Sequence, residues 1–335
     1  MLKKELLSVA DSRAAAGFGD EVNIQIPIEA GDWPVVIESV SCDNSLEWFH
    51  KHSASINSLL LKYGAVLLRG FEIGSPQGFD LHFRALGGDP IDYKNRTSPR
   101  NEVVGNIYTS TTHPKDQVIH MHTENSYSNV YNRIIAFFCL IPSAVGGETP
   151  IADERKLLKF LSEETKQKFR EKGVKYLRNT VPGVGLDWRT IYQTDDVEVV
   201  NKKLREEGVE FKWVDKDHLR VQTILPAFQN HPILNEEMWF NHMYFGHKSL
   251  FDPIVAEFFG DENLPFVTSF GDGSEIDDAT IQEFKDFYAQ HSIVFKWEKD
   301  DFLLLDNMMF SHGRNPFEGE RKILTAMSQP YSFVR

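Results

Sequence analysis

The run Ile134–Pro142 (IIAFFCLIP) is the most apolar stretch of this 335-residue chain, and it limits the folds that the chain can adopt. It is far shorter than the roughly 20 residues that a membrane-spanning helix needs. A short, continuous apolar run of this kind is typical of a strand buried on both faces. The chain is therefore predicted to build its core around an internal strand, and no membrane span is predicted.

Other segments repeat two patterns. Helices are predicted where apolar residues recur at helical spacing between a capping residue and a glycine: 44–63, 75–88, 154–172, 196–207 and 277–290. Short apolar runs predict strands at 65–71, 117–124, 133–140, 293–297, 302–306 and 322–328. Gly146 and Gly147 predict a tight turn between two of these strands.

The order of these elements predicts the fold class. Helices and strands alternate at the start, strands dominate the middle and the end, and an irregular stretch separates them. This order favours a mainly β protein with helical additions, built on a double-stranded β-helix (jelly-roll) core with an α/β N-terminal part. Residues 154–250 are interpreted as a helical insertion or lid. A single domain covering residues 1–335 is expected.

Charge and cysteine content exclude several classes. The chain has 49 acidic and 36 basic side chains, a net charge of −13, which disfavours binding to nucleic acid or to anionic membranes. Its two cysteines, Cys42 and Cys139, form neither a disulfide framework nor a CxxC metal site. With no apolar stretch for a signal peptide near the start, a cytoplasmic location is expected.

His122 and Glu124 form the first candidate site. Residues i and i+2 of a strand point to the same side, so an imidazole and a carboxylate would project together from the predicted strand 117–124. Two histidines and one carboxylate, bound on one face with open positions left over, suit iron(II) in non-haem oxygenases. An HxE tripeptide alone is weak evidence, because a chain with 12 histidines contains such pairs by chance.

A third ligand must come from elsewhere in the chain. His312, in the segment Asp306–Arg314 (DNMMFSHGR), follows a predicted strand and is the main candidate, although a hydrogen-bonded loop residue is the commoner fate of a histidine. His120 competes with it because it lies on the same predicted strand face as His122. Four further histidines are lesser candidates: His113, His242, His247 and His291.

Thr149 and Arg321 form a second candidate site. Thr149 lies in GGETPI and presents a hydroxyl at the start of a strand, and Arg321 lies shortly after His312 in GERKIL. An arginine binds a carboxylate with two parallel hydrogen bonds, so Arg321 could anchor a dicarboxylate beside the metal. An ordinary surface ion pair is the commoner role of such an arginine.

Taken in order, these motifs resemble one family. HTENSYS, GGETPI and the terminal DNxxxxHGRxPFxGxRKIL resemble the taurine dioxygenase/clavaminate synthase-like superfamily of iron(II)- and 2-oxoglutarate-dependent oxygenases. AVLLRGF near the start and SFGDGSEID before the last helix extend the resemblance from about residue 60 to the C-terminus. The HxE form is most similar to the branch that includes amino-acid β-hydroxylases of peptide natural-product pathways.

The resemblance implies cofactors and roles. It implies His122, Glu124 and His312 as iron(II) ligands, and Thr149 and Arg321 as partners of the distal carboxylate of 2-oxoglutarate, with O2 as the other cosubstrate. Arg314 or Lys322 could share the role of Arg321, because the spacing varies in the superfamily. A related halogenase class has a small residue in place of the carboxylate ligand, so the presence of Glu124 favours an oxygenase.

The expected reaction is hydroxylation of an unactivated C–H bond of a small amino-acid-like substrate, free or tethered to a carrier protein, with release of succinate and CO2. Desaturation and epoxidation are variants of this reaction. A zinc hydrolase with the same three ligands and a non-catalytic jelly-roll metal-binding module remain alternative functions. The sequence is also compatible with a homo-oligomer. Candidate substrate residues are Asn125, Tyr127, Ser128, Asn241 and Arg314, and Trp239–His242 could line a lid.

Overall fold

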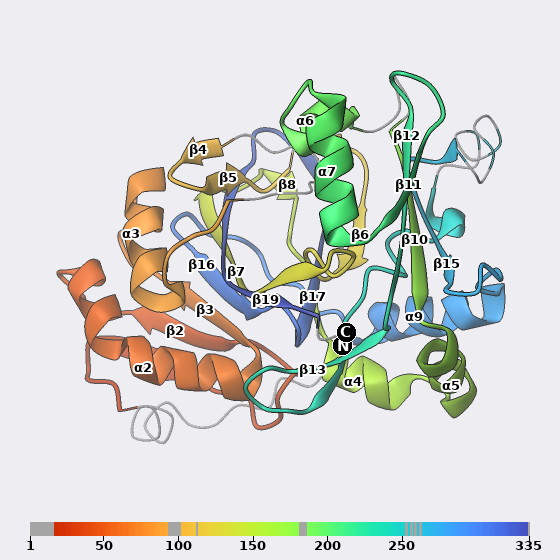
Figure 1. The fold of residues 1–335 in the computed structure, drawn as a ribbon. Coiled ribbons are helices and arrows are strands. Elements are labelled where there is room, and N and C mark those ends of the chain that lie inside the picture. The colour runs from red at the N-terminus through yellow and green to blue at the C-terminus, as the bar shows by residue number, and fades with distance from the viewer. Residues whose placement is uncertain are drawn as a thin grey trace.

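The computed structural model describes residues 17–92, 102–111, 113–180, 186–251 and 263–333, together with Ile254, Glu257 and Gly260. A large sheet and a small sheet form the centre of the molecule (Figure 1). The large sheet has the order β1 (Val22–Gln25), β2 (Val35–Ser39), β3 (Ala65–Arg69), β16 (Phe302–Asp306), β7 (Val130–Ile141), β19 (Lys322–Ser332), β5 (Ile107–Thr109) and β4 (Glu102–Val104).

The run IIAFFCLIP forms most of β7, and it is continuously apolar because both faces of this strand are buried. Side chains alternate between the two faces of a strand, and both faces of β7 are covered. Ile134, Ala136 and Phe138 pack in one core cluster, and their neighbours Ile135 and Phe137 pack in another. The prediction of a strand buried on both faces is confirmed.

The first core cluster lies under an N-terminal α/β layer. β2 and β3 are parallel and are joined by α2 (Ser45–Tyr63), and α3 (Pro76–Gly87) packs beside α2. Asn44 caps α2 by accepting the N–H of Glu47, and Ser75 caps α3 by accepting that of Gly78. Both helices therefore begin where their sequences predict, and the expected α/β part is present (Figure 1).

The second core cluster lies between the large sheet and a small sheet. The small sheet has the order β6 (Ile119–His122), β17 (Phe310–Arg314) and β9 (Ile151–Asp153), and β8 (Val145–Gly146) pairs with β18 (Phe317–Glu318) nearby. A short turn from β16 in the large sheet leads into β17 in the small one. Two facing, mostly antiparallel sheets make the fold jelly-roll-like.

The insertion differs from its prediction, because much of it is a sheet. It contains α4 (Glu154–Phe160), α5 (Glu163–Lys172), α6 (Trp188–Tyr192) and α7 (Val197–Glu207), but also a four-stranded antiparallel sheet. The insertion sheet has the order β11 (Glu210–Trp213), β12 (Leu219–Leu225), β10 (Val174–Asn179) and β15 (Phe266–Phe270). Its strands are rich in polar residues because only one face is buried, which hid them from a search for apolar runs.

Three boundaries also need correction. The helix expected over 154–172 is broken at Leu161, because Ser162 caps a new helix by accepting the N–H of Thr165. Residues 293–297 are alternately buried but form no strand, and only Ile293 pairs, in an isolated bridge to Ile151. β6 ends at His122 and stops short of Glu124.

The remaining elements are β13 (Phe228–Asn230), β14 (Glu237–Trp239), the short 3-10 helix Lys248–Leu250, and α9 (Asp278–His291). α9 packs against α4 and β9, and its buried face joins a third core cluster with the insertion sheet. Among the residues described, no helix is both long enough and apolar enough to cross a membrane.

Candidate metal centre

His122 and His312 face each other across two paired strands. β6 and β17 are antiparallel, and His312 is the register partner of His122. Residues directly opposite one another in such a pair project from the same face of the sheet. The two imidazole rings accordingly lie with their centroids 4.5 Å apart, although they come from distant parts of the chain.

The carboxylate of Glu124 lies beside the two imidazoles, but it is not positioned by a strand as the sequence predicted. It lies in the turn after β6, where Asn307 holds its backbone. Asn307 Oδ1 accepts the Glu124 N–H at 2.7 Å, and Asn307 Nδ2 donates to the Glu124 carbonyl at 2.9 Å. A further bond from Nδ2 reaches the Asn132 carbonyl at 2.8 Å. This Asn307 clamp, and not strand alternation, places the buried carboxylate.

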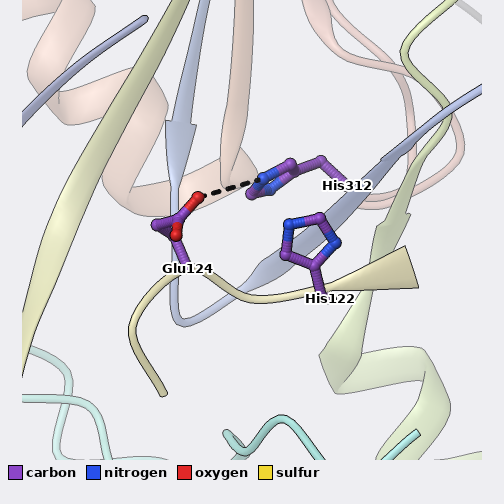
Figure 2. A group of neighbouring side chains, drawn as sticks. All are labelled: His122, Glu124 and His312. Atoms are coloured by element: carbon purple, nitrogen blue, oxygen red, sulfur yellow. Dashed lines mark ion pairs between the residues drawn. The ribbon is translucent and has the colours of Figure 1, made fainter. Parts of the chain in front are cut away.

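The three side chains converge on one point (Figure 2). Glu124 Oε2 lies 4.0 Å from His312 Nε2, and one ligand atom from each residue lies within 4.8 Å of the others. Atoms that share a metal ion at about 2.1 Å lie roughly 3–4 Å apart, so small side-chain rotations would close the cluster around an ion. Two imidazole nitrogens and a carboxylate oxygen are the donor set that suits iron(II) with open positions for other ligands.

The hydrogen bond of His122 selects the tautomer that a metal needs. Its Nδ1 lies 2.8 Å from the carbonyl oxygen of His120. A carbonyl can only accept, so Nδ1 carries the proton and Nε2 presents its lone pair. Metal-binding histidines are commonly oriented in this way by a backbone carbonyl.

The other candidate histidines do not join the cluster in the described part of the chain. His120 contributes its carbonyl to His122, while its ring packs against Tyr244. A bulge in the β6–β17 ladder follows the paired histidines and removes the regular alternation on which its candidacy rested. The four lesser candidates lie outside the cluster as well: His113, His242, His247 and His291.

His242 nevertheless lies directly beside the cluster. Its ring centroid is 5.3 Å from that of His122, and its Nδ1 lies 3.0 Å from the Thr123 carbonyl. Burial, reinforced by the neighbouring His122, lowers the pKa of His242 to about 3, so the ring is neutral at physiological pH. Its Nε2 is buried and has no hydrogen-bond partner among the described residues.

Thr149 and Arg321 are in contact, as their proposed common role requires. Arg321 Nη2 donates to Thr149 Oγ1 at 3.3 Å, and Arg321 Nε donates to the Gly147 carbonyl at 2.7 Å. Gly147 has a φ of +72°, and a Cβ there would lie 2.9 Å from the Arg321 side chain. Trp297 Nε1 donates to the same Thr149 hydroxyl at 3.1 Å. Thr149 comes just before β9, the strand that pairs with β17 at His312.

Arg314 is a buried cation and Arg321 a half-buried one, and neither forms an ion pair with a carboxylate of the described residues. Burial lowers the pKa of Arg321 to about 10, with a further contribution from Arg314. Removing a cation from water without a counterion is costly, so such a site favours an incoming anion. The guanidinium of Arg314 donates instead to the carbonyls of His113 and Gln117, which secures the segment before β6.

The candidate substrate residues separate into two groups. Tyr127 and Ser128 line a pocket, and Asn125 Oδ1 accepts the hydroxyl of Tyr127 at 3.2 Å. The side chain of Asn241 instead bonds backbone groups: its Nδ2 donates to the Ala227 carbonyl, and its Oδ1 accepts the N–H of Met243. Trp239 and Phe240 are buried in two different core clusters, so they pack the interior and do not line a lid.

The pocket lies on the insertion sheet, is partly open to solvent and has a cavity volume of about 60 Å³. Its charged residues are Arg178 on β10 and Glu207 at the end of α7. Neither residue was among the predicted site residues, and Asn307 and Trp297 were not predicted either. Asn307 lies in the DN motif that precedes His312, which was the one signal that could have identified it.

Comparisons with known proteins identify the family of the chain. The family model described as taurine catabolism dioxygenase TauD, TfdA family, matches residues 29–327. The chain is 32% identical over 299 residues to the dapdiamide synthesis protein DdaC of Enterobacter agglomerans, covering 88% of this chain and 91% of that protein. It is 27% identical over 316 residues to a clavaminate synthase-like protein of Arabidopsis thaliana, covering 90% of each.

Solved structures share the fold. PvcB of Pseudomonas aeruginosa matches with a TM-score of 0.53 at 11% identity, covering 92% of each chain. The protein AAD-2, in complex with Mn(II) and N-oxalylglycine, matches with a TM-score of 0.52 at 13% identity, covering 91% of this chain and 96% of that one. The family match extends over most of the sequence, and the chain therefore belongs to the TauD/TfdA family and is an iron(II)- and 2-oxoglutarate-dependent dioxygenase.

Proposed function

We propose that this dioxygenase hydroxylates an unactivated C–H bond of a small amino-acid-like substrate. In this proposal His122, Glu124 and His312 hold iron(II), and Thr149 and Arg321 bind the distal carboxylate of 2-oxoglutarate. The whole chain acts as one cytoplasmic catalytic domain on a double-stranded β-helix core. The observation that carries the proposal is the convergence of two histidines and one carboxylate, at 4.8 Å or less, beside the strand β9 that follows Thr149.

The donor set fits iron(II) because neighbouring residues orient each of the three side chains. His122 is held in the tautomer that leaves Nε2 available, and the Asn307 clamp fixes the backbone of Glu124. His312 is packed against the ring of Phe137 at 4.9 Å, which limits its rotation. When bound, iron supplies the oxidising chemistry by activating O2 at the expense of 2-oxoglutarate, which yields succinate and CO2.

Arg321 and Thr149 would orient the cosubstrate. The half-buried guanidinium of Arg321 offers charge-assisted donors to a carboxylate, and these bonds gain strength where water is excluded. Thr149 adds a hydroxyl whose position is fixed by Trp297 Nε1. The path from Thr149 along β9 to the register partner of His312 is short, so one small dicarboxylate can reach from the anchor to the metal.

The substrate class is supported by the relatives. DdaC is named for dapdiamide synthesis, and PvcB is described as an Fe, alpha-ketoglutarate dependent oxygenase from an isonitrile synthetic pathway. A small amino-acid-like molecule, free or attached to a carrier protein, is consistent with both. The zinc hydrolase and the non-catalytic module are not favoured, because neither accounts for the family match or for Arg321.

Anaerobic titration with iron(II) and 2-oxoglutarate tests the proposal. Wild-type protein is expected to develop the weak visible charge-transfer band of the iron chelate. His122→Ala should abolish the band, whereas His120→Ala, on the same strand but outside the cluster, should retain it. Arg321→Gln should require at least about tenfold more 2-oxoglutarate, since a charge-assisted bond contributes about 1.5–3 kcal/mol.

Lys322→Gln is the matched control for Arg321, because it removes a neighbouring positive charge that was an alternative anchor. Equal loss of 2-oxoglutarate affinity in both variants would contradict the assignment of Arg321. A wild-type protein that shows no band, and binds iron no better than His122→Ala, would contradict the assignment of the metal ligands.

A further inference from the structure

The pocket on the insertion sheet carries two opposite charges on a rigid base. Tyr176 and Arg178 project from the same face of β10, because they are two residues apart. Arg178 is the register partner of Val221 on β12 and of Phe266 on β15, so it lies at the centre of three paired strands. All four of these side chains line the pocket.

Glu207 faces this base from α7. It is the last residue of the helix, before the capping Gly208. A carboxylate at this end is disfavoured by the helix dipole, which makes a cationic partner favourable. Tyr192 lies under the influence of both charges: burial raises the pKa of its hydroxyl to about 12, while Arg178 lowers that pKa and Glu207 raises it. Arg178 and Glu207 therefore act within one pocket.

His242 links the wall of this pocket to the candidate metal ligands. Tyr127 and Phe266 of the pocket contact the ring of His242, with centroids 5.0 and 5.7 Å away, and His242 in turn contacts His122. The pocket residue Tyr176 accepts the backbone N–H of His242 at 3.0 Å. His242 also retains a buried Nε2 without a donor among the described residues, which a substrate N–H can supply.

We propose that this pocket binds the head group of a free α-amino acid, with Arg178 taking the carboxylate, Glu207 taking the ammonium group, and the side chain directed past His242 towards the metal. The inference rests on the proposed function and makes its substrate specific. A carrier-tethered aminoacyl group has no free carboxylate, so the positive charge of Arg178 selects the free amino acid.

Isothermal titration calorimetry tests this proposal. The anaerobic complex with iron(II) and 2-oxoglutarate is titrated with the proteinogenic L-amino acids, and then with the methyl ester and the N-acetyl derivative of each one that binds. At least one free amino acid is expected to bind. Loss of either charge from the ligand should weaken binding by about ten- to a hundredfold, the range for one charge-assisted hydrogen bond.

Substitutions connect each charge to its partner. Arg178→Gln should remove the preference for the free acid over the ester, and Arg178→Lys should restore part of it. Glu207→Gln should remove the preference for the free amine over the N-acetyl derivative. Two controls should bind like wild type: Lys175→Gln, on the other face of β10, and Glu206→Gln, an exposed neighbour of Glu207 on α7.

Three results would overturn the assignment. The first is equal binding of ester and acid to wild type, which points to a carrier-tethered substrate. The second is amino-acid binding that neither pocket variant changes, and the third is the absence of binding by any member of the panel while the chelate band is present. If the chelate band itself is absent, the proposed function fails. The same titration of metal-free protein then decides the pocket separately, since Arg178 and Glu207 do not depend on the metal.

Discussion

Replacing Asn307 by alanine should lower the affinity for iron(II) more than a substitution elsewhere that costs similar fold stability. The Asn307 clamp makes three hydrogen bonds to the backbone of Glu124 and Asn132, at 2.7, 2.9 and 2.8 Å, and Asn307 is fully buried. Each backbone group left without a partner costs roughly 1–3 kcal/mol, so the free energy of unfolding should fall by about 3 kcal/mol or more. The turn that carries Glu124 would also lose its fixed position.

Loss of an outer residue that orients a metal ligand typically lowers metal affinity by about 10–100-fold. Anaerobic titration with iron(II) measures this affinity, and denaturant unfolding of the same protein measures stability. Asn179→Ala is the matched control, because Asn179 is also a buried asparagine that bonds to the backbone, at Leu264, but lies in the insertion sheet. If both variants bind iron equally well, the Asn307 clamp does not position the carboxylate.

Three further predictions concern other parts of the molecule. Burial raises the pKa of Glu154 from 4.5 to about 8, so between these pH values the folded protein keeps a proton that the unfolded chain has released. Stability should therefore fall as pH rises through this window, by at most about 5 kcal/mol, and denaturant unfolding of Glu154→Gln across the window should show a flatter dependence. Trp297→Phe removes the donor to Thr149 and should raise the dissociation constant of 2-oxoglutarate about three- to tenfold while leaving iron affinity unchanged, as measured by the chelate band. Gly64→Ala should destabilise the fold by at least about 1 kcal/mol in the same unfolding assay, because Gly64 has a φ of +81° and a Cβ there would lie 2.6 Å from the ring of Phe310; an unchanged midpoint would contradict this reasoning.

Local patterns were sufficient where a segment's neighbours in sequence decide its structure. α2 and α3 begin at the predicted caps, because a cap is a contact between residues three apart. β16 covers the predicted residues, and β7 extends the predicted strand 133–140 by three residues at its start and one at its end. The apolar run of β7 also indicated correctly that both of its faces are buried, since transfer from water is favourable for each apolar side chain of the run.

The insertion sheet was missed because its strands depend on one another. The sequence of β10, VKYLRN, is mostly polar, and β12 and β15 complete its hydrogen bonds from distant parts of the chain. No short-range pattern identifies such partners. The pocket charges share this property, because Arg178 on β10 and Glu207 on α7 line one pocket although they are distant in sequence.

The amino-acid sequence by itself determined the candidate chemistry of this protein: the HxE pair, the later histidine, and the threonine and arginine that follow the family's order. Tertiary structure alone decided how these groups meet. Glu124 lies in a turn held by Asn307, and Arg321 lies in a partly buried site without a counterion among the described residues. The physical reason is that residue identity specifies which bonds a side chain can form, whereas strand pairing and burial specify which partners it encounters and how strongly they interact.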